Sequence, residues 1–204
     1  GIPIERIKIS VFKGDELTPL DEESLEIWKG LGIPYDKVIF GERKDNFWGP
    51  TGLEGPCGPT TEIYIDGIEI WNIVFNEFYC GADGKFTPLQ HSGVDTGMGL
   101  ERLALILQKV PTIYETDLFK NIIGDSNKKE ERIIADHIRS SVFLISDGFT
   151  PSNTEAGYIL RRLIRRAVRF AKVLNLAEDF YKTAVDSIIR TYKNVYPELE
   201  KNSE

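Results

Sequence analysis

The spacing of apolar residues changes near Pro111, and no other feature limits the possible folds of this 204-residue chain as strongly. Before Pro111, apolar and polar residues alternate in short runs, which is typical of half-buried strands. After it, apolar residues recur at helical spacing. We therefore expect an α+β chain, with a sheet domain over residues 1–124 and an α-helical domain over residues 125–204.

These patterns also predict the individual elements. Strands are expected at residues 6–12, 38–40, 62–66 and 69–79, with a tight turn at 83–84 before a returning strand at 86–89. Helices are expected at residues 18–29, 100–109, 130–145, about 155–174 and 179–192, the fourth capped by Ser152, Asn153 or Thr154. The glycines and prolines of residues 45–59 exclude a regular element there and favour a binding loop.

Composition limits the class of protein. Hydrophobic residues make up 41% of the chain and the net charge is −7, which fits a globular protein and excludes a disordered or collagen-like one. No apolar run approaches the roughly 18 residues of a membrane span, so no membrane partner is expected. Cys57 and Cys80 have no metal-binding spacing, so we expect no zinc site and a reduced, cytoplasmic setting.

A basic stripe interrupts this acidic chain. Between Gly157 and Lys172 there is no acidic residue, and six are basic: Arg161, Arg162, Arg165, Arg166, Arg169 and Lys172. On a helical wheel they lie opposite Leu160 and the other apolar residues. The stripe is either a solvated face or a surface for nucleic-acid phosphates, and the lack of acidic partners gives the second interpretation equal weight.

Residues 93–103 run from a glycine-containing turn into a helix. Gly97 and Gly99 allow a ligand to approach the backbone, and a helix N-terminus favours an anion. Arg102 in the first turn can bind a phosphate in forked geometry, and Asp95 can hold an ammonium group. The structural alternative is a simple corner in which Arg102 pairs with a surface carboxylate.

Glu69 lies on the longest expected strand, near Trp71 and Phe75. A carboxylate among aromatic residues costs free energy unless it is paired or binds a metal, so Glu69 is a candidate Mg²⁺ ligand for a phosphate substrate. Cys57 has no recognisable base, and His137 has the spacing of a core histidine. A cysteine nucleophile is therefore not favoured.

Several ordered blocks resemble the alanyl-tRNA synthetases, a family of class II aminoacyl-tRNA synthetases. In the first half they are residues 45–48 (DNFW), 55–63 (GPCGPTTEI), 69–75 (EIWNIVF) and 94–102 (VDTGMGLER). In the second half they are residues 135–139 (ADHIR), 147–148 (DG), 151–153 (PSN) and 157–166 (GYILRRLIRR). Residues 49–54 depart from the family's usual Met-Gly-Asp stretch, which leaves the local loop geometry open.

The resemblance implies an antiparallel sheet flanked by helices, followed by a helical tRNA-recognition domain. It also implies that residues 97–102 form the third class-defining motif, with Arg102 on the γ-phosphate of ATP. The implied alanine pocket comprises Trp48, Asn72, Val74, Asp95 and Gly97, with Asp95 receiving the substrate ammonium group. Asn153 matches the position that reads the acceptor-stem G·U pair of tRNA(Ala), and the arginine stripe would follow the RNA backbone.

The implied activity is ATP-dependent activation of alanine and its transfer to tRNA(Ala). The family's first two class-defining motifs would precede Gly1, and the second supplies an arginine for the α-phosphate. We therefore expect the C-terminal part of a catalytic domain with the first tRNA-recognition helices, inactive without a complementary N-terminal half. Two alternatives stay open: a non-catalytic paralogue that binds RNA, and an interaction module that kept only the fold.

Overall fold

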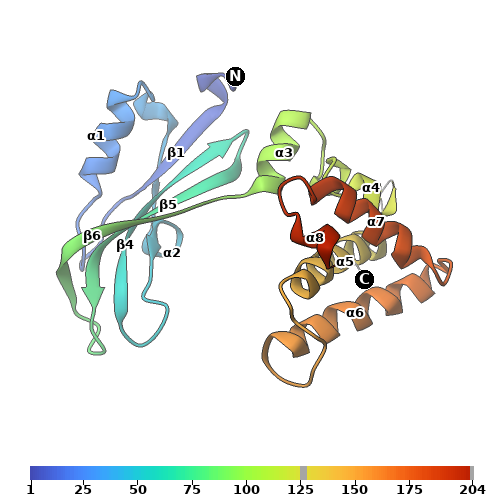
Figure 1. Ribbon diagram of the computed structural model, residues 1–204. Helices are drawn as coiled ribbons and strands as arrows, with labels where there is room; N and C mark the ends of the chain where they lie inside the picture. Colours follow the sequence, from blue (N-terminus) through green and yellow to red (C-terminus); the bar gives the residue numbers. More distant parts are fainter. Residues whose placement is uncertain (125–127, 203–204) are drawn as a thin grey trace. The chain divides into compact units, whose positions relative to one another are not determined.

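The computed structural model describes residues 1–124 and 128–202. The chain divides into two compact units, unit 1 (Gly1–Ile106) and unit 2 (Leu107–Glu204), whose elements are labelled in Figure 1. Strands dominate unit 1, and the regular elements in the described residues of unit 2 are helices. Among the described helices, none is long and apolar enough to cross a membrane.

Unit 1 contains a mixed, mostly antiparallel sheet with the strand order β2-β1-β4-β5-β6, and β3 pairs with β4 outside this path. Only β1 and β2 run parallel. The strands are β1 (Ile7–Phe12), β2 (Val38–Gly41), β3 (Phe47–Trp48), β4 (Gly55–Ile65), β5 (Ile68–Cys80) and β6 (Phe86–Met98). Its helices are α1 (Glu22–Gly30), the short α2 (Arg43–Asn46) and α3 (Leu100–Gln108).

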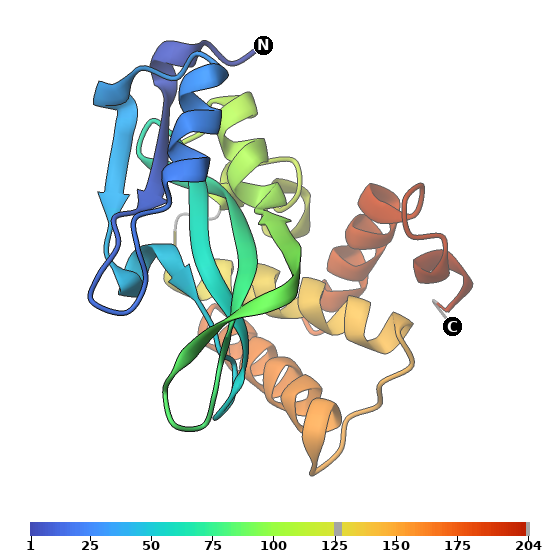
Figure 2. The ribbon, with the colours of Figure 1, turned by 90° about the vertical axis from the view of Figure 1, so that its left-hand side faces the viewer.

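One face of this sheet is covered by α1, which lies beside the strands in Figures 1 and 2. Trp28 of α1 packs on the buried Ile9 and donates a hydrogen bond from Nε1 to Thr61 Oγ1 at 2.7 Å. Ile106 of α3 packs with Ile65 at the end of the same face. The opposite face carries a different, polar set of side chains and contains the candidate site.

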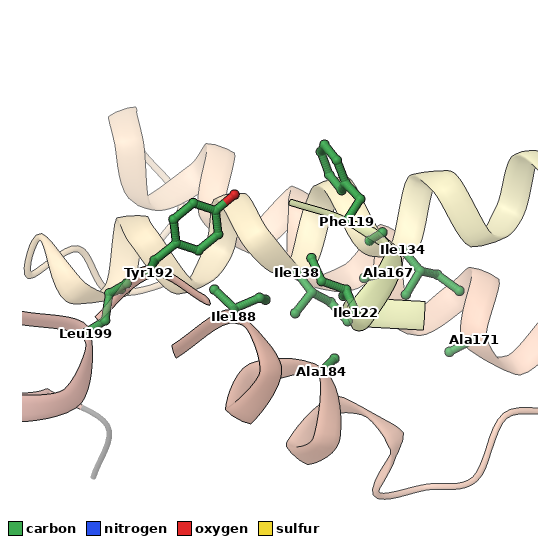
Figure 3. Close-up of a cluster of buried hydrophobic side chains, with 11 residues drawn as sticks. Phe119, Ile122, Ile134, Ile138, Ala167, Ala171, Ala184, Ile188, Tyr192 and Leu199 are labelled. Atoms are coloured by element: carbon green, nitrogen blue, oxygen red, sulfur yellow. The ribbon is translucent and has the colours of Figure 1, made fainter. Parts of the chain in front are cut away.

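Unit 2 is built around α5 (Lys129–Ser146), α6 (Glu155–Val173) and α7 (Phe180–Tyr192), with the short helices α4 (Lys120–Ile123) and α8 (Glu198–Lys201). Each long helix has an apolar stripe, as the helical spacing predicts. Figure 3 shows these stripes meeting, with Ile134 of α5, Ala167 of α6 and Ile188 of α7 in one buried cluster.

Residues 45–59 are not irregular throughout, as the sequence led us to expect, because β3 and the start of β4 occupy part of them. Pro59 lies within a register shift of the β4–β5 ladder between Cys57 and Thr60, a place where strand prolines are tolerated. A Cβ at Gly58 would lie 1.7 Å from a carbonyl oxygen of β5, so only glycine fits there. Breaker residues alone therefore misled the prediction.

Two other boundaries differ from expectation. Residues 93–98 continue β6 and are not a loop, because they pair with β5 up to the Trp71–Met98 pair. The division between the compact units lies at Ile106 and not near residue 124. The reason is packing, since Phe119 and Ile122 are buried in the core of unit 2.

Candidate functional site

The face of the sheet opposite α1 brings four expected pocket residues together. In the β5–β6 ladder, Asn72 lies opposite Gly97, and Val74 lies opposite Asp95. Opposed residues point to the same face, as do residues two apart on one strand, so these four form one cluster, the pocket quartet. Asp95 and Gly97 are exposed, and no atom lies within 4 Å of a Cβ built on Gly97. Open space therefore lies above Gly97 and Asp95, whereas Val74 is buried beside them at 7% exposure.

Glu62 on β4 fixes the orientation of Asn72. Its Oε1 accepts a hydrogen bond from Asn72 Nδ2 at 3.2 Å, and its Oε2 accepts from the hydroxyls of Ser10 (3.0 Å) and Tyr64 (2.5 Å). Glu62 is only 6% exposed, so its carboxylate depends on these donors. The arrangement leaves Asn72 Oδ1 buried and without a partner in the described part of the chain. An unpartnered acceptor near Asp95 suits a cationic group.

The network beneath Asn72 extends to α2. Burial and the hydrogen bond to Glu62 raise the pKa of the Tyr64 phenol, so its hydroxyl remains a donor at physiological pH. Asn46 of α2 donates from Nδ2 to Ser10 Oγ (2.6 Å) and to the carbonyl oxygen of Thr60 (3.0 Å). These buried hydrogen bonds hold the floor of the quartet in place and leave only Asn72 Oδ1 of the network without a partner among the described residues.

Arg102, in the first turn of α3, pairs with Glu69 at the start of β5. Its Nη1 donates to the carbonyl oxygen of Glu69 at 2.8 Å and to Oε2 at 3.1 Å. A Cβ at Gly99 would lie 3.3 Å from Arg102 Cδ, so glycine leaves room for this side chain. The pairing with a carboxylate, the structural alternative from the sequence, is therefore present. It occupies both hydrogens of Nη1 and leaves Nη2 and Nε as a fork for an anion.

Trp48 lies on β3, which is separated from β5 of the quartet by β4. On β3 it is opposite Gly58 of β4, and two residues further along β4 Thr60 is opposite Val74 of the quartet. Trp48 is 38% exposed. A register shift in the β4–β5 ladder lies between Cys57 and Thr60, so strand alternation does not assign Trp48 to the face of the quartet.

Glu69 is the candidate ligand for a magnesium ion. In residues 1–124 and 128–202 no group of three or more His, Cys, Asp or Glu side chains could hold a metal ion by itself. A magnesium ion that arrives with a nucleotide needs only one or two protein carboxylates besides the phosphates. Glu69 fits this requirement because only its Oε2 contacts Arg102.

The cysteines have no catalytic geometry. Cys57 and Cys80 are both buried and reduced. Burial and the nearby Cys80 raise the pKa of the Cys57 thiol, so little thiolate forms at neutral pH. This agrees with the sequence, which did not favour a cysteine nucleophile.

The basic stripe lies on α6 of unit 2. Leu160, Ala167 and Ala171 are buried, and the opposite side of the helix is exposed. Its exposed arginines, Arg162, Arg165, Arg166 and Arg169, have no carboxylate partner among the described residues, whereas Arg6, Arg43 and Arg102 each pair with a carboxylate. A charge face without internal partners remains available to an external anion.

Asn153 is presented by the loop before α6. Its Oδ1 accepts a hydrogen bond from Nη1 of the half-buried Arg161. The loop closes through Ser152, whose backbone N donates to the carbonyl oxygen of Gly157 at 3.0 Å. A Cβ at Gly157 would lie 2.3 Å from Ser152 Oγ, so a side chain there would open the loop. Thr154 is the N-cap of α6 but makes no side-chain capping bond, contrary to expectation.

Two residues that matter for these sites were missed by sequence reasoning. Glu62 shares one face of β4 with Thr60 and Tyr64. A side chain with a polar group at every second position was the signal that the sequence offered for this face. His137 is buried as expected at 9% exposure, and it also lines a cavity with Arg162 and Arg166. The sequence around His137 contains no signal that places α5 beside the arginines of α6.

Known proteins resemble this chain along its whole length. The chain matches the family described as tRNA synthetases class II (A) over residues 1–204. It is 42% identical to an alanine–tRNA ligase of Treponema denticola, over 99% of this chain and 39% of the relative. It is 40% identical to those of Borrelia hermsii and Idiomarina loihiensis, over 100% of this chain and 40% and 26% of the relatives. The chain thus spans at most about two fifths of these relatives.

Proposed function

The chain belongs to the class II tRNA synthetases, and from this premise we propose that it is part of an alanine–tRNA ligase, which activates alanine with ATP and transfers it to tRNA(Ala). The observation that carries the proposal is the pocket quartet on the open face of the sheet, close in sequence to Arg102. Unit 1 would supply part of the aminoacylation domain. Unit 2 would begin the tRNA-recognition domain.

In this proposal the quartet binds alanine. An ammonium group has three hydrogens to donate, and Asp95 and the unpartnered Asn72 Oδ1 are acceptors for them. Val74 supplies apolar surface for the small methyl side chain, and Trp48 would approach the alanine from β3. Because Glu62 holds Asn72 from below, the acceptor is oriented before the substrate arrives.

ATP would bind beside the quartet. The free fork of Arg102 suits the γ-phosphate, Glu69 suits the magnesium ion of ATP, and Gly97 and Gly99 leave room for the nucleotide. The alanine carboxylate attacks the α-phosphorus in line, and pyrophosphate leaves. The task of these residues is to orient the two substrates and offset charge during the attack.

The acceptor stem of tRNA(Ala) would contact unit 2. Asn153 is exposed on its loop beside Arg161, and the arginines of α6 offer positive charge to the RNA backbone. A non-catalytic, RNA-binding paralogue is the second candidate, and the unpaired arginines alone fit it equally well. The pocket quartet favours the ligase, because an RNA-binding protein has no use for a preoriented ammonium site.

The test is the binding of a non-hydrolysable alanyl-adenylate analogue, measured by calorimetry on the chain together with its complementary N-terminal half. Asp95→Ala should weaken binding tenfold or more, on the order of one charge-assisted contact. Asp83→Ala, at the exposed β5–β6 turn, is the matched control and should change nothing. Equal binding by the Asp95 and Asp83 variants would contradict the proposed alanine site.

A further inference from the structure

A cavity of about 320 Å³ opens between α5 and α6 of unit 2. It is lined by His137, Ile159, Arg162, Leu163 and Arg166. The two arginines are one helical turn apart on α6, and their guanidinium groups lean toward opposite ends of the helix, that of Arg162 toward Tyr158 and that of Arg166 toward Phe170. The cavity therefore combines two cations, one imidazole and two aliphatic side chains within a single compact unit.

The two arginines are oriented by aromatic side chains and not by carboxylates. The guanidinium carbon of Arg162 lies 5.6 Å from the ring centroid of Tyr158, and that of Arg166 lies 5.9 Å from the ring centroid of Phe170. Neither arginine has a carboxylate partner within the described part of the chain. Their N–H groups are therefore free for anions at the two ends of the cavity.

His137 offers the cavity a hydrogen-bond acceptor. Its Nδ1 lies 2.9 Å from Asp136 Oδ2, and a carboxylate accepts, so Nδ1 carries the hydrogen in the neutral ring. The other nitrogen, Nε2, is then an acceptor, and no described residue hydrogen-bonds to it. An acceptor beside two anion-binding arginines calls for a ligand that carries a hydroxyl donor close to a phosphate.

We propose that this cavity binds one nucleotide unit of an RNA strand, with its two flanking phosphodiesters on Arg162 and Arg166 and the ribose 2′-hydroxyl donating to His137 Nε2. Ile159 and Leu163 would contact the carbon atoms of the sugar. The 2′-hydroxyl is the group that distinguishes RNA from DNA, so the cavity selects RNA. The inference rests on the proposed contact of α6 with RNA. It adds a specific binding site for one nucleotide, which we call the nucleotide seat (His137, Arg162 and Arg166), and a reason for the selection of ribose over deoxyribose.

The test is fluorescence anisotropy with an RNA hairpin of the acceptor-stem sequence and with its DNA counterpart. The full chain should bind RNA more tightly than DNA, by about three- to tenfold for one hydrogen bond. His137→Leu should abolish this preference, and His137→Gln, whose Oε1 can replace Nε2, should retain it. If His137→Leu does not fold, a 2′-O-methyl hairpin removes the same donor from the RNA and should bind the native chain as weakly as DNA.

Two double variants distinguish binding in the nucleotide seat from general electrostatic attraction between α6 and RNA. Arg162→Ala with Arg166→Ala should lower RNA affinity and remove the preference for RNA over DNA, whereas Arg165→Ala with Arg169→Ala should lower affinity and keep the preference. In the seat variant the slope of log affinity against log salt should fall by about 1.4 to 1.8. An unchanged preference for RNA over DNA in the Arg162/Arg166 and His137→Leu variants would overturn the proposed nucleotide seat. The proposed contact of the α6 arginines with RNA would not be affected by that result.

If the proposed contact of α6 with RNA is itself wrong, the same variants give a different result. If neither double variant lowers RNA affinity, α6 does not contact RNA, and both that proposed contact and the nucleotide seat are wrong. If AMP binds the cavity as tightly as the hairpin and does not compete with it, the cavity is a site for a free nucleotide, which would also overturn the proposal. Competition by AMP only at far higher concentration supports an RNA strand as the ligand.

Discussion

Nη1 of Arg102 lies 2.8 Å from the carbonyl oxygen and 3.1 Å from Oε2 of Glu69, so one side chain joins the first turn of α3 to the start of β5. The two side chains are 51% and 36% exposed. Water therefore screens the pair, and it stabilises the fold by about 1 kcal/mol or less. Its main consequence is orientation, because it leaves Nη2 and Nε of the guanidinium free for a phosphate.

Arg102→Ala should separate activity from stability. We expect alanine-dependent ATP–pyrophosphate exchange, measured with the complementary half present, to fall by about 10²-fold, because a positioned cation that offsets developing charge is lost. The free energy of unfolding should change by about 1 kcal/mol or less. Arg6→Ala, which breaks the exposed pair with Asp66, is the control and should leave exchange unchanged. Full activity in Arg102→Ala would refute its role on ATP.

Glu62→Ala should destabilise unit 1. The change leaves the buried donors of Ser10, Tyr64 and Asn72 without their acceptor, at a cost of about 2 kcal/mol or more. Urea denaturation measures this loss. Glu22→Ala, in the exposed first turn of α1, should stay within about 0.5 kcal/mol. Similar values for the two variants would show that the network does not hold the floor of the quartet.

Two glycine substitutions should have opposite effects. Gly97→Ala adds a methyl group where no atom lies within 4 Å, so thermal stability should be unchanged or slightly higher while analogue binding falls. Gly58→Ala places a methyl group against a carbonyl oxygen of β5, and unfolding free energy should drop by about 2 kcal/mol or more. A stable Gly97→Ala protein with undiminished binding would mean that the ligand does not lie over Gly97.

Glu77→Gln should stabilise the chain in a pH-dependent way. Burial, with the charges of Asp21 and Glu23, raises the pKa of Glu77 in the folded state. The folded state then binds a proton more readily than the unfolded one, so stability present at low pH is lost as pH rises through the folded pKa. We expect Glu77→Gln to unfold at a higher temperature than the native chain at pH 7. The difference should vanish below about pH 4, the ordinary range of a glutamate; a constant difference would contradict this cause.

Local patterns predicted most of the elements, for a physical reason. The helices α5, α6 and α7 each bury one side, and the strand β5 is a long run of β-branched and aromatic residues, so the signal for each lies in consecutive residues. The start of β4 and the end of β6 were missed because glycine and proline are tolerated there only in the presence of their partner strands. No single segment contains that information.

The residues of the candidate site likewise divide into those that the local sequence predicted and those that depend on distant partners. Asp95 and Arg102 lie in one short block, and the β5–β6 register brings Asp95 beside Val74. Glu62 was missed because its role depends on Ser10 and Asn72, which come from other strands. The pairing of Arg102 with Glu69 was foreseen only as an unspecified surface carboxylate, since the partner is 33 residues away.

Alanine-dependent ATP–pyrophosphate exchange tests the central claim most directly, with the chain alone, with the chain mixed with its complementary N-terminal half, and with Asp95→Ala in that mixture. We predict negligible exchange by the chain alone, measurable exchange in the mixture, and loss of that exchange in Asp95→Ala. No exchange in the mixture, although both parts are folded and form a complex, would contradict the proposed ligase and favour the RNA-binding paralogue. Exchange by the chain alone at the rate of a complete synthetase would contradict the expected need for a second half.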